Sequence, residues 1–300
     1  MNILVTGAWR CTQTQLNQIA MLGHRVFFLQ QEREKLPLPY EQVEAVICNG
    51  LFLHHPIENF TKLRYIQLTS AGFDRVPMEY IKAHNIEIHN ARSVYSIPMA
   101  EFAVAGVLQL YKRSRFFAEN QKRHKWEKHR ALLELCGKNV CIVGCGSVGT
   151  ECAKRFGAFG CCVTGVDIFP RADEHYQRML SLDRLEEILP EADVLILTLP
   201  LTDESWHLIN RARFSKLKDG AVLVNIARGA VVDTASMTDW LLESRGAAVL
   251  DVFEEEPLSE DSPLWEMENV ILTPHNSFVG EGNLLRIFNV IMDGLEGIIQ

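Results

Sequence analysis

Three ionisable side chains in the second half of the chain each follow a short apolar run that predicts a β-strand. Arg228 lies in an Asn-Ile-Ala-Arg-Gly stretch, Glu256 precedes a proline, and His275 ends a Leu-Thr-Pro-His stretch. A guanidinium can hold a carboxylate through two parallel N–H bonds, and an imidazole can give and take a proton near neutral pH. The extended backbone favoured before proline would fix the direction of the Glu256 carboxylate. Taken singly, they also fit a surface arginine, a solvated acidic run and a structural histidine.

The three residues are stronger candidates for a functional site when taken together, because open α/β sheets bind their ligands at the carboxyl ends of the strands. We therefore expect the three side chains to meet at one sheet edge, where they would handle an anion and a proton.

A glycine-rich loop points to a second ligand. Gly144, Gly146 and Gly149 form a Gly-x-Gly-x-x-Gly pattern directly after the apolar run 139–143 and before a helical pattern. The first glycine allows a tight turn, the second lets the backbone approach a pyrophosphate, and the third lets the helix pack on the strand. The helix N-terminus then offers unpaired N–H groups to phosphates. Strand, loop and helix in this order predict a dinucleotide site more strongly than the glycines alone.

The next predicted strand ends at Asp167, eighteen residues after Gly149. A carboxylate at this position accepts hydrogen bonds from the adenosine ribose and repels a 2′-phosphate, which favours NAD over NADP. Arg171 leaves NADP open, because an arginine beside the ribose can accommodate that phosphate.

Short apolar runs that could position these residues alternate with helix-like segments along the whole chain. Their lengths and spacing predict parallel strands joined by crossovers, in an α/β protein with two doubly wound sheets. A helical pattern begins near Pro98, and the segment 283–299 has apolar residues at helical spacing. If that last segment returns to the first sheet, a Rossmann domain over 96–277 is inserted in a flavodoxin-like domain formed by 1–95 and 278–300.

The amino-acid composition limits the kinds of partner that the chain could bind. With 38 acidic and 30 basic residues the chain carries a net charge of −8, the wrong sign for binding nucleic acid or anionic lipid. Residues 112–130 depart from this balance with eight Lys or Arg and two Glu, and form either a solvated helix and loop or a patch for anionic ligands. The eight cysteines show no Cys-x-x-Cys metal spacing. With no signal-peptide pattern at the start, we expect a cytoplasmic protein with reduced cysteines and no metal.

In these motifs the chain resembles the D-isomer-specific 2-hydroxyacid dehydrogenases, a family that includes D-lactate, glycerate and 3-phosphoglycerate dehydrogenases. The resemblance covers nearly all 300 residues and includes 225–233, 250–257 and 262–275 besides the glycine loop. It implies that Arg228 binds the substrate carboxylate and C2 oxygen, that His275 is the acid/base, and that Glu256 hydrogen-bonds His275. Hydride would pass between NADH and C2 of a small 2-keto acid, giving the D-2-hydroxy acid.

The resemblance also implies which residues surround the ligands. We expect the dinucleotide to lie beside Gly144, Gly146, Ser147, Val148, Gly149, Asp167, Ile168, Leu199, Pro200, Ala227 and Asp251. In the first domain, Ser70, Ala71 and Gly72 look like the family's substrate loop, whose backbone N–H groups hold the carboxylate. Asn49 and Gly50 are placed to flank the substrate's side chain. Both loops also have ordinary structural interpretations, as a glycine turn and as core.

The chain departs from the family pattern in two places. Asn276-Ser277 follows the catalytic histidine where small or apolar residues are usual, and the connection from Arg228 to Glu256 is one residue short. Glu254 therefore stays a second candidate for the acid that pairs with His275.

Two alternative functions remain open at this point. One is a phosphoglycerate-dehydrogenase-like enzyme, in which Arg10, Arg75 or Arg92 would have to reach a phosphate. The other is a non-catalytic NAD-sensing interaction protein on the same fold. As in the family, we expect a homodimer, paired through the helix from residue 98 to about 111.

Overall fold

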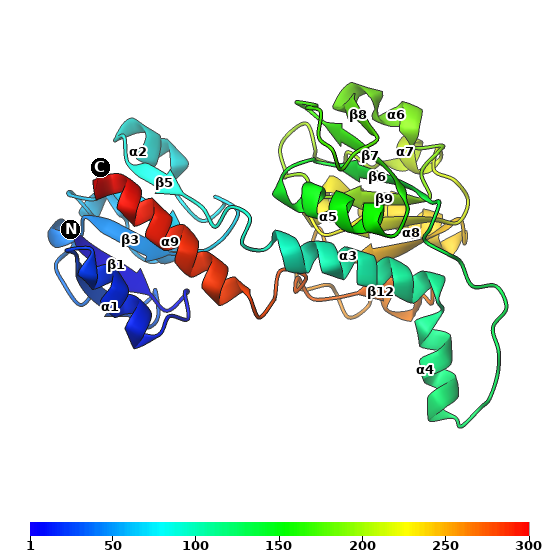
Figure 1. Cartoon of the computed structure of the whole chain (residues 1–300), viewed down its shortest axis with the longest axis horizontal. Helices are drawn as coiled ribbons and strands as arrows, with labels where there is room; N and C mark the ends of the chain where they lie inside the picture. Colours follow the sequence, from blue (N-terminus) through cyan, green and yellow to red (C-terminus); the bar gives the residue numbers. More distant parts are fainter. Residues whose placement is uncertain (300) are drawn as a thin grey trace. The chain divides into compact units, whose positions relative to one another are not determined.

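The computed structural model describes residues 1–299 and divides the chain into two compact units (Figure 1). Unit 1 comprises Met1–Tyr95 and Gly280–Gln300, and unit 2 comprises Ser96–Val279. Each unit contains one parallel sheet, of five strands in unit 1 and seven in unit 2. The predicted α/β fold with two parallel sheets is confirmed. Within residues 1–299, none of the helices combines the length and apolar character that crossing a bilayer demands.

The sheet of unit 1 has the order β2-β1-β3-β4-β5. Its strands are β1 (Asn2–Thr6), β2 (Arg25–Leu29), β3 (Ala45–Cys48), β4 (Tyr65–Leu68) and β5 (Glu87–His89). The central strands β3 and β4 are buried at every position, as expected for a parallel sheet with both faces covered. The helices of this unit are α1 (Gln13–Met21), α2 (Met78–Ala83) and α9 (Asn283–Ile299).

The C-terminal helix α9 belongs to the core of unit 1. Ile287, Ile291 and Leu295 are buried in one apolar cluster with residues of β1, β3 and β4. Gly294 allows this approach, since a Cβ there would lie 2.2 Å from the Tyr65 hydroxyl. The helical spacing of 283–299 therefore reflects a face packed on the first sheet.

The parallel sheet of unit 2 has the order β12-β11-β10-β9-β6-β7-β8, and the order in which the chain adds strands reverses between β6 and β9. The strands are β6 (Asn139–Val143), β7 (Cys162–Asp167), β8 (Arg178–Ser181), β9 (Val194–Leu197), β10 (Ala221–Asn225), β11 (Gly246–Leu250) and β12 (Val270–Leu272). The helices are α3 (Ser96–Tyr111), α4 (Ser114–Lys122), α5 (Ser147–Ala158), α6 (Leu185–Ile188), α7 (Arg211–Phe214) and α8 (Thr234–Leu242). Short 3₁₀ turns of the two units lie at Tyr40–Gln42, Leu51–Leu53, Ile57–Asn59, Leu182–Arg184, Gly229–Val231 and Pro263–Glu266.

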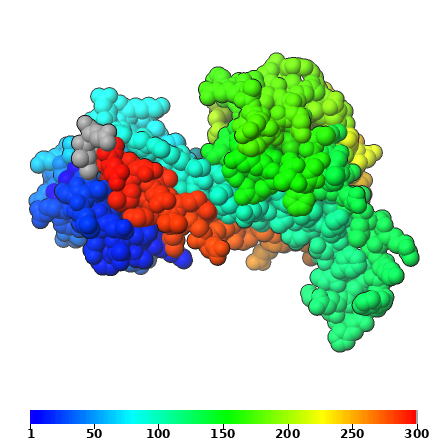
Figure 2. All heavy atoms as spheres, viewed as in Figure 1, coloured from blue at the N-terminus to red at the C-terminus, as the bar shows by residue number. Residues whose placement is uncertain are grey.

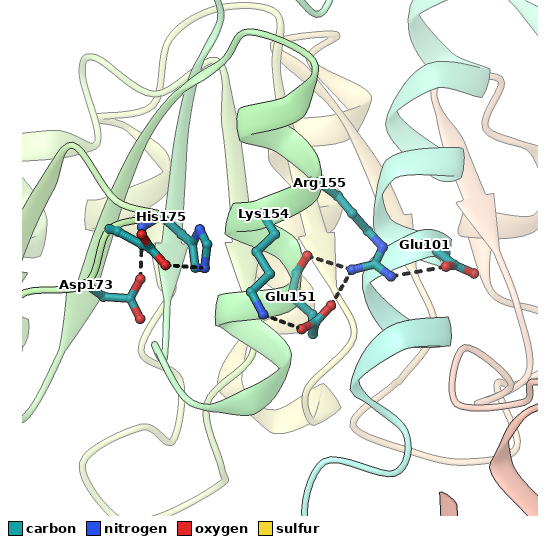
Figure 3. A network of polar contacts seen from close by, with 7 residues as sticks. Glu101, Glu151, Lys154, Arg155, Asp173 and His175 are labelled. Carbon is teal, nitrogen blue, oxygen red and sulfur yellow. Dashed lines mark hydrogen bonds and ion pairs between the residues drawn. The ribbon is translucent and has the colours of Figure 1, made fainter. Parts of the chain in front are cut away.

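Helix α3 is packed inside unit 2. A Cβ on Gly106 would lie 2.6 Å from Cγ1 of Val249, so the helix rests directly on β11. Figure 3 shows Arg155 of α5 between Glu151 and Glu101, and its Nη2 lies 3.1 Å from Glu101 of α3. The apolar face that predicted a dimer helix is thus used within the unit.

Residues 114–134, which we call the arm, extend away from the body of unit 2 (Figure 2). The arm consists of α4 and the irregular segment that returns to β6. Trp126 is 98% exposed, and Phe117, Leu132 and Leu133 are also exposed. The basic stretch 112–130 therefore lies mostly on this exposed arm.

Candidate active site

The three predicted catalytic residues leave neighbouring strands at the same edge of the unit 2 sheet. Asn225 at the end of β10 pairs with Leu250 of β11, and Leu250 pairs with Leu272 of β12. Because the three strands are parallel and in register, the loops that carry Arg228, Glu256 and His275 begin side by side. The prediction that these residues gather at one carboxyl edge matches this arrangement.

His275 and Glu256 form a hydrogen-bonded pair. Nδ1 of His275 lies 2.9 Å from Oε2 of Glu256, and Oε1 of Glu256 accepts a 3.0 Å bond from the Phe253 backbone N–H. A ring that donates from Nδ1 to the carboxylate keeps Nε2 for proton exchange with a ligand. Both side chains are partly exposed, at 43% and 37%, so a ligand can reach the imidazole.

The buried carboxylate of Asp251 holds the turn that carries His275. Its Oδ1 accepts bonds from the Thr273 hydroxyl at 2.7 Å and the Asn276 N–H at 2.7 Å, and its Oδ2 accepts the Ser277 N–H at 2.9 Å. The Asp251 carbonyl also accepts the His275 N–H at 2.8 Å. Asp251 is fully buried.

The oxygens of Asp251 are thus used within the protein, where they position the turn, and its contact with the dinucleotide stays a prediction. Asn276 and Ser277 serve the turn through their backbone N–H groups, which other residues would also supply, so these bonds do not explain the polar side chains at the two positions. His275 itself has a φ of +51°, a left-handed conformation that the surrounding bonds hold in place.

Glu254, the second candidate acid, has other partners. Its carboxylate pairs with Nε2 of His207 and accepts a 3.0 Å bond from the Thr234 N–H at the start of α8. Burial raises the pKa of Glu254, but the bonds from Thr234 and His207 outweigh burial and hold that pKa below its ordinary value. Glu254 as the partner of His275 is wrong, and it instead ties the Glu256 loop to the loop after β9.

The turn that carries Arg228 is fixed by Asn225, which is 1% exposed. Its Oδ1 accepts the Ala227 N–H at 3.1 Å, and its Nδ2 donates to the Arg228 carbonyl at 3.0 Å. A Cβ on Gly229 would lie 1.8 Å from the carbonyl carbon of Phe253. Only glycine therefore lets the Arg228 turn pack directly on the backbone of the Glu256 loop.

A pocket of about 480 Å³ opens above the glycine loop of unit 2, at the reversal between β6 and β9. Six predicted cofactor residues line it, namely Gly144, Gly146, Asp167, Ile168, Leu199 and Pro200. Ser147, Val148 and Gly149 lie in the first turn of α5 instead, and Ala227 and Asp251 do not line the pocket. Lining residues that the sequence reasoning missed are Val143, Val166, Phe169, Leu182, Thr198, Thr202, Glu204 and Ser205. Thr198 could have been predicted from the sequence, since it lies directly before the predicted residue Leu199 and just after the end of β9.

The three glycines fit a dinucleotide phosphate loop. Gly144 has a φ of +93°, and a Cβ there would lie 2.7 Å from the Leu199 nitrogen. A Cβ on Gly149 would lie 2.2 Å from the Gly144 carbonyl oxygen, whereas one on Gly146 meets nothing within 4 Å. Helix α5 has no side-chain cap and no acidic residue in its first turn. The open space at Gly146 and the uncapped N–H groups suit a bound pyrophosphate.

Asp167 has a fixed carboxylate at the rim of this pocket. Its Oδ2 accepts the Cys145 N–H at 2.7 Å, and its Oδ1 accepts the Phe169 N–H at 2.9 Å. Ile168 and Phe169 beside it are 62% and 73% exposed. A carboxylate for ribose hydroxyls and apolar walls for an adenine ring therefore stand together.

The two predicted substrate loops lie next to each other in unit 1. Cys48 at the end of β3 pairs with Leu68 of β4, so residues 49–50 and 70–72 follow neighbouring strands. Within residues 1–299, the backbone N–H groups of Ser70, Ala71 and Gly72 donate to no other group. The N–H groups of Asn49 and Gly50 are instead taken by the Glu32 carboxylate, each at 2.7 Å.

Comparison with known proteins shows which family this chain is similar to. Residues 104–277 match the family model described as D-isomer specific 2-hydroxyacid dehydrogenase, NAD binding domain. The D-3-phosphoglycerate dehydrogenase of Archaeoglobus fulgidus is 34% identical over 247 residues, 81% of this chain and 47% of that protein. The glyoxylate reductase of Korarchaeum cryptofilum is 31% identical over 240 residues, 78% of this chain and 72% of that protein. The chain spans less than half the length of two curated relatives that it matches, the D-3-phosphoglycerate dehydrogenases of Archaeoglobus fulgidus and Methanocaldococcus jannaschii.

A solved structure supports the same relationship. The D-lactate dehydrogenase of Aquifex aeolicus, in complex with NAD and lactic acid, has a TM-score of 0.77 and 26% identity, covering 99% of this chain and 95% of that one. The family model matches more than half of the chain. The matched residues include this chain's glycine loop, Asp167 and all three candidate catalytic residues. The chain therefore belongs to the D-isomer specific 2-hydroxyacid dehydrogenase family, and residues 104–277 match the NAD-binding domain of that family.

Proposed function

We propose that this chain is an NAD-dependent oxidoreductase that reduces C2 of a small 2-keto acid to the D-2-hydroxy acid. The observation that carries the proposal is the His275–Glu256 pair, which stands at the same sheet edge as Arg228 in the unit that contains the dinucleotide pocket. The curated relatives, a phosphoglycerate dehydrogenase and a glyoxylate reductase among them, are enzymes of this reaction class.

Each residue of the site has one task in this reaction. The Arg228 guanidinium binds the substrate carboxylate and the C2 oxygen, which orients the keto carbon. NADH held beside Gly144, Gly146 and Asp167 would supply the hydride to C2. His275 gives a proton from Nε2 to the C2 oxygen as negative charge develops there, and Glu256 stabilises the imidazolium that holds this proton. In the oxidation direction, neutral His275 accepts the hydroxyl proton.

The substrate and cofactor contacts extend this proposal. The free N–H groups of Ser70, Ala71 and Gly72 support a substrate-carboxylate loop, with Asn49 and Gly50 beside the substrate's side chain. We accordingly assign residues 1–95 and 278–300 to a substrate domain and 96–277 to a dinucleotide domain. The Asp167 carboxylate supports NAD as the preferred cofactor over NADP.

The direct test is a panel of 2-keto acids assayed with NADH and with NADPH. The proposal predicts NADH oxidation with at least one of pyruvate, glyoxylate, hydroxypyruvate, 2-ketoisocaproate or phenylpyruvate. Arg228→Gln should lower kcat/KM by about 100-fold or more while leaving NADH affinity within about threefold. NADH binding without turnover of any keto acid would instead support a non-catalytic NAD-sensing protein.

We also propose that the protein is a cytoplasmic homodimer. The arm exposes apolar residues, above all Trp126, and carries an excess of basic residues in a chain of net charge −8. Both features support pairing of the arm with a second copy of this acidic chain. The eight cysteines, all in the described part of the chain, are free thiols, which supports a reducing compartment. Light scattering at about physiological salt should give twice the 34.1 kDa chain mass for the native protein, and the chain mass itself for Trp126→Glu.

A further inference from the structure

The strands of the unit 1 sheet are parallel, and the order in which the chain adds them reverses between β1 and β3. Strand β1 pairs with β2 on one side and β3 on the other, in the order β2-β1-β3-β4-β5. At such a point the loops after the two central strands turn to opposite faces, which leaves a crevice at the carboxyl edge. Backbone N–H groups in that crevice are a ready site for an anion.

Here a carboxylate of the protein itself fills the anion site. Oε1 of Glu32 accepts the Thr6 hydroxyl at the end of β1, at 2.8 Å, and the Asn49 N–H just after β3, at 2.7 Å. Oε2 accepts the Gly50 N–H at 2.7 Å. The side chain thus bridges the ends of the two strands that flank the reversal.

Glu32 is held from its other end as well. Its carbonyl oxygen lies 2.8 Å from Nε2 of His55, which is 6% exposed, and Nδ1 of His55 lies 2.8 Å from the Tyr40 hydroxyl. The carboxylate has a fixed place, because both its backbone and its oxygens are bonded.

The charge of this carboxylate has no cationic counterpart in residues 1–299. Its three donors are two backbone N–H groups and a hydroxyl, all neutral. The stem of Arg75 lies close by, with its Cδ 3.9 Å from the position of a Cβ on Gly50, but among the described residues no ion pair joins Arg75 to Glu32. The crevice therefore presents a negative charge where its backbone alone would attract anions.

This crevice adjoins the loop 70–72, because the Thr69 N–H donates to the Cys48 carbonyl at 2.9 Å. We propose that Glu32 is a specificity-determining residue that rejects 2-keto acids whose side chain carries a second anionic group, phosphate or carboxylate. The inference rests on the proposed function and narrows its substrate class to 2-keto acids with a neutral side chain. It separates this chain from the phosphoglycerate dehydrogenases among its relatives.

A matched pair of substrates tests the inference. Hydroxypyruvate and its 3-phosphate differ only in the phosphate, so the ratio of their kcat/KM values with NADH reports the response to that group. For an assumed separation of about 10 Å, repulsion between the fixed carboxylate and a dianion predicts a wild-type preference for hydroxypyruvate of about 100-fold. Glu32→Gln should narrow the ratio by about tenfold or more.

Glu34→Gln is the matched control, since it removes the same charge from an exposed position two residues away. It should leave the ratio within about twofold of wild type. Raising the salt concentration from about 20 to 500 mM should narrow the wild-type ratio at least threefold, a measurement that needs no variant.

Turnover of both substrates with equal kcat/KM, a salt-independent ratio, or the same change in both variants would overturn the role of Glu32 and leave the proposed function intact. Wild-type protein that turns over neither substrate, nor any other 2-keto acid of the panel, would overturn the proposed function and this inference with it.

Discussion

Replacing Asp251 with asparagine tests how the position of His275 is maintained. The carboxylate accepts three bonds from the turn 273–277, and the amide of Asp251→Asn can accept at only one of its two ends. If the amide oxygen keeps Thr273 and Asn276, the NH₂ group faces the Ser277 N–H. Ser277 is 3% exposed, so water cannot replace the lost acceptor.

The expected cost follows from these contacts. One buried N–H left unsatisfied costs about 1–3 kcal/mol, and the two remaining bonds lose their charged acceptor, so we expect a destabilisation of about 2–4 kcal/mol. A displacement of the imidazole by about 1 Å lowers the rate about 100-fold. NADH affinity should stay within about threefold of wild type, because the Asp251 side chain does not line the dinucleotide pocket.

Urea denaturation, steady-state kinetics with the best keto acid, and NADH fluorescence titration measure the three quantities. Thr273→Val is the control, since it removes one donor and leaves the carboxylate, and should cost about 1 kcal/mol and less than tenfold in kcat. Wild-type kinetics in Asp251→Asn would refute the positioning role. A loss of NADH affinity of tenfold or more with unchanged kcat would instead show that Asp251 contributes to binding the cofactor.

Three further changes test other parts of the site. Glu256→Gln should lower kcat about 100-fold, whereas Glu254→Gln in the same loop should stay within about threefold, and equal losses would contradict the assignment of the pairs. Because the pKa of Glu254 is lowered in the folded protein, its stabilisation is present above the ordinary pKa of 4.5 and is lost as the pH falls through the lowered value. The thermal midpoint of Glu254→Gln should therefore lie below that of wild type near about pH 7 and converge with it once the pH falls below the lowered pKa, and a constant difference would refute the linkage. Asp167→Ala should raise the NADPH-to-NADH ratio of kcat/KM about tenfold, and an unchanged ratio would show that the carboxylate does not select the cofactor.

Much of the fold was predictable because parallel strands buried on both faces are nearly continuous apolar runs. Strands such as β6 and β9 stand out for this reason. The edge strand β8, Arg178–Ser181, has only two apolar residues and gave no such signal. The helix face of α3 was visible in the sequence, but its partner was not, since an apolar stripe fits a neighbouring helix as well as a second subunit.

The candidate site, like the fold, could be predicted only in part from the sequence. Arg228, Glu256 and His275 could be predicted because each follows a recognisable strand, and strand order brings them to one edge. The bonds that hold them could not, since Asp251 and Glu254 find their partners across loops that only the folded chain brings together. Glu32 gave no signal for the same reason, because its acceptor role depends on the pairing of β1 with β3.

The most direct test of the central claim is a single-turnover measurement on His275→Gln. The variant, loaded with NADH, is mixed in a stopped-flow instrument with the best keto acid of the panel, and the decay of NADH absorbance is followed. A proton donor at His275 predicts a rate of NADH oxidation about 1,000-fold below wild type, with NADH affinity unchanged within about threefold. A wild-type rate in this variant would contradict the account.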